Sequence, residues 1–247
     1  MSGLRAIYNS IFLYLSLSCI LLFGVIGMST QAEDPLDELY VLIQDEDSDG
    51  IDEFLKNHFS DFKNQRTFQQ LAAQNPQLLR GCLNQKALEE NFYNSCFEHS
   101  LVFGNRETLQ IFFEDGVDLE AKMGERRGRT PLFFSCSYCS LSSVEFLLDM
   151  GVDPNQQMNC SSPLHWMAYS PMSDRFRRRA KEGIATEAEI EFAEKLESRQ
   201  RRIIDLLLDS GANPEALNAE SKTFLQVARD RGRFDIVEEF DVTEPEG

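Results

Sequence analysis

The chain has little of the side-chain chemistry that most enzymes and metal sites use. Only three of its 247 residues are histidine, namely His58, His99 and His165, although histidine is the usual proton shuttle near neutral pH and a frequent zinc ligand. The sequence also lacks a glycine-rich phosphate-binding loop. We therefore expect no enzyme and no cofactor.

Basic residues are scarce as well. The sequence has 24 lysine and arginine residues against 41 aspartate and glutamate residues, which gives a net charge of −17. Such a chain repels nucleic acid and anionic lipid, because both carry the same sign of charge. The balance excludes a general binder of nucleic acid or anionic lipid, and it favours solubility or a basic partner. The hydrophobic content of 42% predicts a folded core rather than disorder.

Charge is absent from a long apolar run between Ile11 and Met28. Arg5 precedes this run, and small or polar residues follow it up to Ala32, as in a secretory signal peptide. We expect cleavage of residues 1–32, with an uncleaved N-terminal membrane anchor as the alternative. Because the acidic residues follow the run, the rest of the chain is expected to be translocated. The predicted compartment is the periplasm of a Gram-negative bacterium, although a eukaryotic secretory route fits the same signal.

A glycine-turn pattern recurs in the rest of the chain. An apolar helix end, a glycine, an apolar residue and Asp or Asn follow one another at 112–118, 147–155 and 207–214. A second signature, Thr-Pro-Leu at 130–132 and Ser-Pro-Leu-His at 162–165, precedes two of these segments. Together they resemble ankyrin repeats, whose unit is a β-turn and two antiparallel helices with a Thr-Pro-Leu-His start. The interval from Gly116 to Gly151 is close to the repeat length of about 33 residues.

The resemblance implies an all-α ankyrin-repeat solenoid of about five repeats, joined by short β-turn hairpins. Thr or Ser before Pro caps a helix start, and glycine accepts the left-handed conformation at a helix end. We predict a helical N-terminal region with a degenerate cap repeat at 33–103, a repeat stack at 104–240 and an acidic tail at 241–247. Residues 61–94 are predicted to be helical, but their sequence does not align with the repeat pattern.

The fourth repeat is interrupted by an insertion at 171–198, which begins with a cluster of basic residues: Arg175, Arg177, Arg178 and Arg179. One interpretation is a loop followed by an outer helix that is several turns longer than usual, with solvated charges. The other is a specific contact element, since insertions in repeat proteins often lie on the binding face.

Ankyrin-like stacks present a concave face of hairpin tips and inner helices, which binds partner proteins. The resemblance implies that the variable positions on this face bind the partner. The candidate residues are Arg126, Arg127, Arg129, Tyr138, Met158, Asn159, Ser161, Tyr169, Lys222 and Arg231, together with the basic residues of the insertion. Trp166 is assigned to the core because large aromatic residues are mostly buried.

Two motifs suggest ion binding. Asp45, Asp47 and Asp49 resemble the start of a calcium-binding EF-hand loop, but Lys56 stands where the bidentate glutamate belongs. The same residues fit a turn between two helices, which we favour. Zinc binding by Cys136, Cys139, Cys160 and His165 is disfavoured, because the repeat places Cys160 too far from the other cysteines. In an oxidising compartment, Cys82 and Cys96 are the favoured disulfide pair, with Cys136 and Cys139 as the alternative.

The sequence thus predicts a monomeric, non-enzymatic protein-binding module in the periplasm. One concrete form is an inhibitor or immunity protein that occludes a secreted toxin or enzyme. The alternative is a calcium- or metal-dependent accessory factor of the cell envelope.

Overall fold

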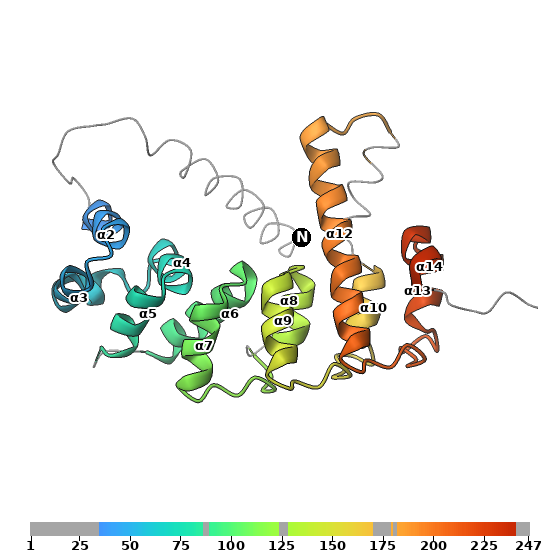
Figure 1. The fold of residues 1–247 in the computed structure, drawn as a ribbon, viewed down its shortest axis with the longest axis horizontal. Helices are drawn as coiled ribbons and strands as arrows, with labels where there is room; N and C mark the ends of the chain where they lie inside the picture. Colours follow the sequence, from blue (N-terminus) through green and yellow to red (C-terminus); the bar gives the residue numbers. More distant parts are fainter. Residues whose placement is uncertain (1–34, 86–88, 124–127, 170–178, 180–181, 241–247) are drawn as a thin grey trace, which may run out of the picture. The chain divides into compact units, whose positions relative to one another are not determined.

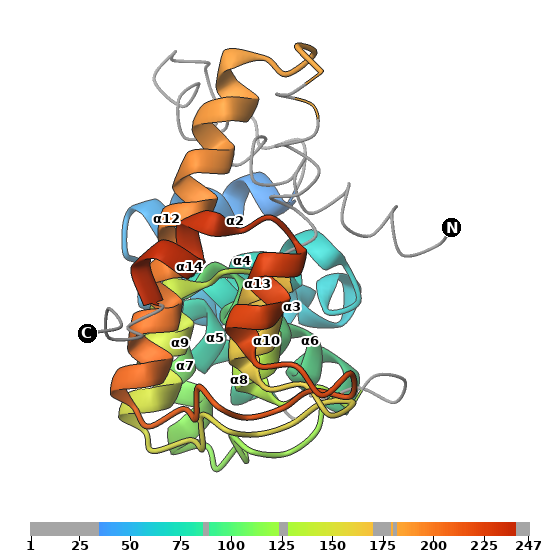
Figure 2. The same ribbon diagram turned by 90° about the vertical axis from the view of Figure 1, so that its right-hand side faces the viewer.

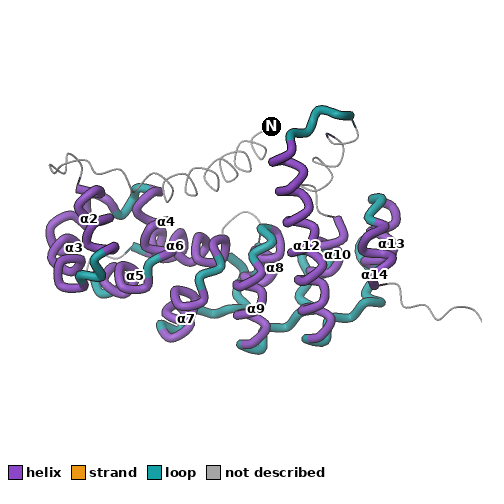
Figure 3. Tube along the Cα trace, turned by 45° about the horizontal axis from the view of Figure 1, so that its top comes forward, coloured by secondary structure: helices purple, strands orange, loops and turns teal. Residues whose placement is uncertain are grey.

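The computed structural model describes residues 35–85, 89–123, 128–169, 179 and 182–240, and the regular secondary structure of these ranges is helical (Figure 3). The chain divides into two compact units, residues 1–41 and 42–247, and the division falls inside α2 (Pro35–Gln44). No helix in the described ranges is both long and apolar enough to cross a membrane. The predicted signal peptide and the acidic tail lie outside these ranges.

Helices of the second unit form two rows, in which each helix packs against the next helix of its own row. Figure 1 shows the succession. The inner row consists of α4 (Arg66–Gln74), α6 (Glu90–Phe103), α8 (Pro131–Ser137), α10 (Pro163–Tyr169) and α13 (Phe224–Asp230). The outer row consists of α3 (Ser48–Phe62), α5 (Pro76–Leu83), α7 (Arg106–Glu114), α9 (Leu141–Asp149) and α12 (Glu187–Asp209). α14 (Phe234–Phe240) packs against α13. The all-α prediction is confirmed.

The helix boundaries follow the residues that the repeat pattern singles out. Thr130 precedes α8, and its side chain accepts a hydrogen bond from the Phe133 amide, while Pro131 occupies the first turn. Gly116 and Gly151 follow α7 and α9 with φ angles of 91° and 83°. Side chains other than glycine are disfavoured in this left-handed region, so glycine ends these helices as expected.

Short hairpins precede α10 and α13, and Met123 pairs with Arg129 before α8; these segments lie together at one end of the helix rows (Figure 2). In one of them Met158 pairs with Ser161 across a tight turn. The two central residues, Asn159 and Cys160, have φ angles of 51° and 59°, as a two-residue type I′ turn requires. The structure therefore contains the β-turn hairpins that the resemblance implied.

The structure adds one helix pair, α4 and α5, in the region that had no predicted register. α4 packs against α6 in the inner row, and α5 packs between α3 and α7 in the outer row. Asn75 caps α5 by accepting a hydrogen bond from the Leu78 amide, and Pro76 follows in the first turn. The pair therefore belongs to the same two rows as the recognisable repeats.

α12 contains the second half of the predicted insertion. The helix has 23 residues and begins at a capping box, in which Thr186 and Glu189 satisfy each other's backbone amides. Ala193 and Leu196 on its added turns are buried, whereas Ile190 is 40% exposed. The observed helix agrees with the interpretation of a lengthened outer helix. Partner binding by the insertion stays a prediction.

A buried polar network ties α12 to the last helix pair. Arg233 is fully buried, and its guanidinium donates to the Gln200 side chain at 2.9 Å and to both carboxylate oxygens of Asp235 at 3.0 and 2.8 Å. The Gln200 amide nitrogen lies 3.6 Å from the Cys139 sulfur. These bonds satisfy a charge that would otherwise be costly to bury.

Candidate functional site

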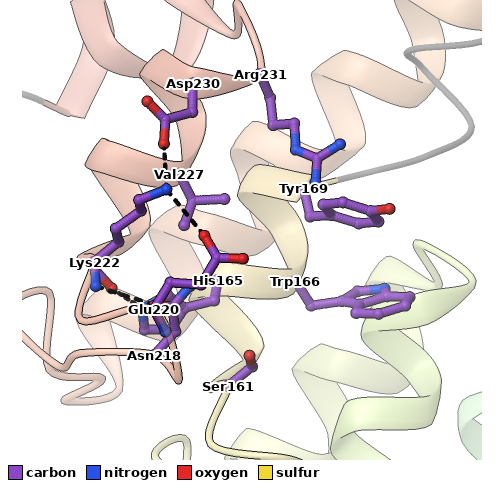
Figure 4. A pocket seen from close by; sticks show the side chains of 10 residues that line it. All are labelled: Ser161, His165, Trp166, Tyr169, Asn218, Glu220, Lys222, Val227, Asp230 and Arg231. Atoms are coloured by element: carbon purple, nitrogen blue, oxygen red, sulfur yellow. Dashed lines mark hydrogen bonds and ion pairs between the residues drawn. The ribbon is translucent and has the colours of Figure 1, made fainter.

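A pocket of about 310 Å³ opens between α10, α13 and the hairpin that precedes α13 (Figure 4). α10 supplies aromatic side chains, and the hairpin and α13 supply charged ones. The lining residues are Ser161, His165, Trp166, Tyr169, Asn218, Glu220, Lys222, Val227, Asp230 and Arg231. Two consecutive repeats thus form one site.

The α10 wall of the pocket is aromatic. Trp166 and Tyr169 are one helical turn apart, so their side chains lie on the same face of α10, and their ring centroids are 5.9 Å apart. The Arg231 guanidinium lies 4.1 Å from the Tyr169 ring centroid, within the range of a cation–π contact. Trp166 also contacts Phe133 of α8, with centroids 5.4 Å apart. We call Phe133, Trp166 and Tyr169 the aromatic strip.

The opposite wall is charged and internally paired. The Lys222 ammonium lies 2.9 Å from a Glu220 oxygen and 2.8 Å from an Asp230 oxygen. The hydrogen bond from Lys222 to Asp230 raises the pKa of the lysine, and the hydrogen bond to Glu220 raises it by a smaller amount. The lysine therefore stays charged and neutralises part of the acidic wall.

His165 forms the floor of the pocket and joins the two repeats. One ring nitrogen lies 2.8 Å from the Ser162 hydroxyl, and the other lies 2.9 Å from the Lys222 carbonyl oxygen. Burial lowers the pKa of His165, which the hydrogen bond to the Lys222 carbonyl partly opposes. With both nitrogens engaged, His165 serves as a structural bridge.

Basic charge continues along the aromatic strip toward α6. The Arg129 guanidinium lies 6.0 Å from the Trp166 ring centroid. Burial raises the pKa of Glu98 on α6, and the positive charge of Arg129 opposes this shift. Arg129 thus contacts the Trp166 ring, whereas Arg231 contacts the Tyr169 ring.

The structure brings four of the predicted binding residues into the pocket: Ser161, Tyr169, Lys222 and Arg231. Met158 and Asn159 lie in the neighbouring hairpin. Tyr138 ends α8 and is 39% exposed. Arg179 lies elsewhere, because its guanidinium bonds to the Ile184 carbonyl at 3.1 Å and to Glu189 at 3.2 Å. Arg126, Arg127, Arg175, Arg177 and Arg178 lie outside the described residues.

The other six lining residues are not among the predicted binding residues: His165, Trp166, Asn218, Glu220, Val227 and Asp230. The assignment of Trp166 to the core was wrong, because Trp166 is half-buried and lines the pocket. Its position three residues before Tyr169 would have placed it on the same helix face as a predicted binding residue. Asn218 closes the hairpin, where its side-chain oxygen accepts hydrogen bonds from the amides of Glu220 and Lys222.

The acidic turn at 45–49 precedes α3. Asp47 is the N-cap, and its side chain accepts a hydrogen bond from the Gly50 amide at 3.0 Å. Among the residues described, no group of three His, Cys, Asp or Glu side chains could hold a metal ion. The Asp47 carboxylate, one of the three candidate calcium ligands, thus caps α3, which agrees with the interpretation of a turn between two helices.

All five cysteines in the described ranges are free, including Cys82 and Cys96, so the expected disulfide is not formed in this structure. Cys82 is on α5 and Cys96 on α6, which belong to different rows. The Cys96 thiol lies 3.5 Å from the Gln69 carbonyl oxygen of α4, to which it can donate. Burial raises the pKa of both thiols, which leaves them unreactive as nucleophiles.

Comparison with known proteins supports the repeat assignment. Residues 127–156, which hold α8 and α9, match the family model described as "Ankyrin repeat". Together with the two rows of helices, this match confirms an all-α ankyrin-repeat solenoid, and the chain contains an ankyrin repeat.

Curated relatives match about half of the chain. Over 139 residues the chain is 30% identical to the putative E3 ubiquitin-protein ligase XBAT35 of Arabidopsis thaliana, and this match covers 55% of the chain and 24% of that protein. The chain is 28% identical over 137 residues to the transient receptor potential channel pyrexia of Drosophila melanogaster, covering 53% of this chain and 14% of that protein. The putative E3 ubiquitin-protein ligase XBAT34 of Arabidopsis thaliana is 30% identical over 137 residues, covering 54% of this chain and 28% of that protein. The matches span less than a third of each relative.

Proposed function

We propose that this chain is a non-enzymatic protein-binding module, and that the pocket between α10 and α13 is part of its binding face. Ankyrin repeats are generally protein-binding modules, which supports the general role. The observation that carries the proposal is the aromatic strip, where Trp166 and Tyr169 stand beside the exposed Arg231. Tryptophan, tyrosine and arginine are the residues most enriched at the energetic centres of protein interfaces.

The ligase and channel names of the relatives are not part of this proposal. The matches cover between 14% and 28% of those proteins, and binding is the property that a repeat segment can have by itself.

We further propose that the chain is exported and acts in the periplasm, where it would occlude a secreted toxin or enzyme as an inhibitor or immunity protein. The support is the charge-free run from Ile11 to Met28 with Arg5 before it. Secretion or an uncleaved N-terminal anchor is the alternative for the same segment. A monomer is expected, since neighbouring repeats cover each other's apolar faces within one chain.

Affinity capture from an envelope extract, followed by mass spectrometry, tests the binding function. The bait is the full chain, compared with Tyr169→Ala and with Arg202→Ala, whose arginine is exposed on the outer helix α12. We expect a specific partner that is lost with Tyr169→Ala and kept with Arg202→Ala. Truncating an interface centre costs about 2 kcal/mol or more, roughly a 30-fold loss of affinity. Equal retention by both folded variants would contradict a binding role for the pocket.

A second pair of variants tests the insertion. Ile184 and Ile190 are 54% and 40% exposed near the start of α12, so Ile184→Ser and Ile190→Ser leave the buried turns intact. Loss of the captured partner would place a contact on the insertion. Unchanged capture would favour the interpretation of a lengthened outer helix.

A further inference from the structure

The charges around the pocket are not equally available to a ligand. Lys222 engages both Glu220 and Asp230, and His165 engages the Lys222 carbonyl. Arg231 differs, because within the described part of the chain its guanidinium contacts the Tyr169 ring and no carboxylate. The pocket therefore offers a ligand one positive charge whose hydrogen-bond donors are unused.

The Tyr169 ring also orients that charge. A guanidinium stacked on an aromatic ring keeps its fork of N–H donors at the edge, where a carboxylate can accept two parallel hydrogen bonds. Stacking limits the freedom of the side chain before binding, so less entropy is lost when a ligand arrives. Arg231 is exposed, so a ligand can approach it.

The aromatic strip supplies the second contact. Trp166 is half-buried, and its centroid lies 5.9 Å from that of Tyr169, over which Arg231 lies. In an extended peptide, alternate side chains point to the same face and are separated by roughly 6.5 Å. A peptide can thus place an aromatic side chain against Trp166 and, two residues away, an acidic side chain on Arg231. The pocket volume of about 310 Å³ is at the lower end for ligand sites and suits single side chains.

From this juxtaposition we infer that the pocket binds an extended segment of a partner protein in which an acidic and an aromatic residue are two positions apart. The inference rests on the proposed function, since it names the chemistry that the same pocket selects. The net charge of −17 opposes an acidic partner at long range, but salt screens charges beyond about 8 Å. A partner that is neutral or basic overall avoids this long-range repulsion, and a single carboxylate in its bound segment is enough to pair with Arg231.

The single tryptophan of the chain, Trp166, is a direct reporter of the pocket. A displayed library of random nine-residue peptides is selected on the full chain, and the enriched peptides are synthesised with blocked ends. Each peptide is then titrated while Trp166 fluorescence is followed. We expect the enriched peptides to carry Asp or Glu two positions from an aromatic residue. Each of them should change the Trp166 fluorescence in a way that saturates with peptide concentration.

The decisive comparison replaces the peptide carboxylate by its amide. On the wild-type chain the amide peptide should bind about 10- to 100-fold more weakly, the range for a charged hydrogen bond. On Arg231→Gln the acid and amide peptides should bind within about threefold of each other, and on Arg231→Lys the difference should be intermediate. Arg202→Gln on α12 is the matched control and should keep the full discrimination.

Three results would overturn the inference: enrichment of basic peptides, enrichment of none, or acid–amide discrimination that persists in folded Arg231→Gln. Circular dichroism establishes folding of each variant. These results leave the proposed binding function intact if partner capture still depends on Tyr169. Loss of that dependence would remove the function as well.

Discussion

His165 and Arg231 line the same pocket, yet their side chains have different tasks. His165 is 4% exposed and bonds to Ser162 and to the Lys222 carbonyl oxygen, so it holds the hairpin of one repeat against the inner helix of another. Arg231 is exposed and rests on Tyr169. A substitution at His165 should therefore change stability, whereas one at Arg231 should change binding.

The first prediction concerns the pH dependence of His165→Gln. Burial lowers the pKa of folded His165, whereas the unfolded value is about 6.5. As pH falls below about 6.5, the unfolded chain gains a proton that folded His165 resists, so the wild type loses stability toward acid. Glutamine does not titrate. At pH 7 it should cost about 1–2 kcal/mol in lost hydrogen bonding, and this cost should shrink at pH 5.

Urea unfolding at pH 7 and pH 5, followed by circular dichroism, measures this difference. Burial also lowers the pKa of His99, and that contribution cancels because both proteins retain His99. A cost of substitution that is equal at the two pH values would show that His165 keeps its ordinary pKa in the fold.

At the same scale, the sequence identified only part of the pocket. Tyr169, Lys222 and Arg231 were found because the repeat resemblance assigns variable positions to the binding face. Trp166 was assigned to the core from the burial tendency of large aromatic residues. The three-residue spacing from Tyr169 places Trp166 on the binding face of α10, but how far α13 and its hairpin cover that face depends on the packing between repeats.

At the scale of elements, α12 is anchored by side chains outside its own repeat. Gln200 in the middle of α12 accepts a hydrogen bond from Arg233, which Asp235 holds in a bidentate pair. The added first turns of α12 come directly before this anchor in the sequence. The network thus connects the insertion with the last helix pair, which supplies Arg231 to the pocket.

The second prediction tests this connection with Asp235→Asn. The substitution keeps the side-chain size but leaves the fully buried Arg233 charge without its carboxylate. Removing one partner of a buried ion pair costs about 3 kcal/mol. Chemical unfolding should show that loss, whereas the control Glu194→Gln on the exposed face of α12 should change stability by less than about 0.5 kcal/mol.

An effect of Asp235→Asn no larger than that of the control would mean that water reaches Arg233 in solution. Hydrogen exchange gives an independent check, because a weakened anchor should increase exchange in α12 and α14 before it does so in α9.

The sequence allowed the boundaries of helix pairs with glycine turns to be predicted. For the pair α4 and α5 it indicated helical structure but no boundaries. Gly116 and Gly151 mark helix ends by their left-handed backbone, and Thr130 and Pro131 mark a start. Between α4 and α5 the chain turns at Asn75, so the glycine signal is absent. The cap formed by Asn75 before Pro76 was the available indication of a helix start.

At the scale of the whole molecule, helices of the second unit contact mainly their neighbours in the two rows. Stability in such an array is roughly a sum of helix-pair terms and interface terms between neighbours. The pocket belongs to one of these interfaces, because its two walls come from α10 and from α13 with its hairpin. Loss of the last pair should therefore abolish the pocket without unfolding the distant pairs.

The third prediction uses Phe224→Ala to produce that loss. Phe224 is 1% exposed at the start of α13, and removing a buried phenylalanine ring costs about 3–5 kcal/mol. The cost should fall on α13 and α14, so their hydrogen exchange should rise while exchange in α4 to α7 stays unchanged. Trp166 emission should shift to the red, because the wall opposite it is lost. Phe113→Ala, at a position that is 43% exposed, is the matched control and should change neither signal. Uniformly faster exchange in every helix would instead show that the second unit unfolds as a single cooperative body, in which case the pocket could not open independently of the remaining repeats.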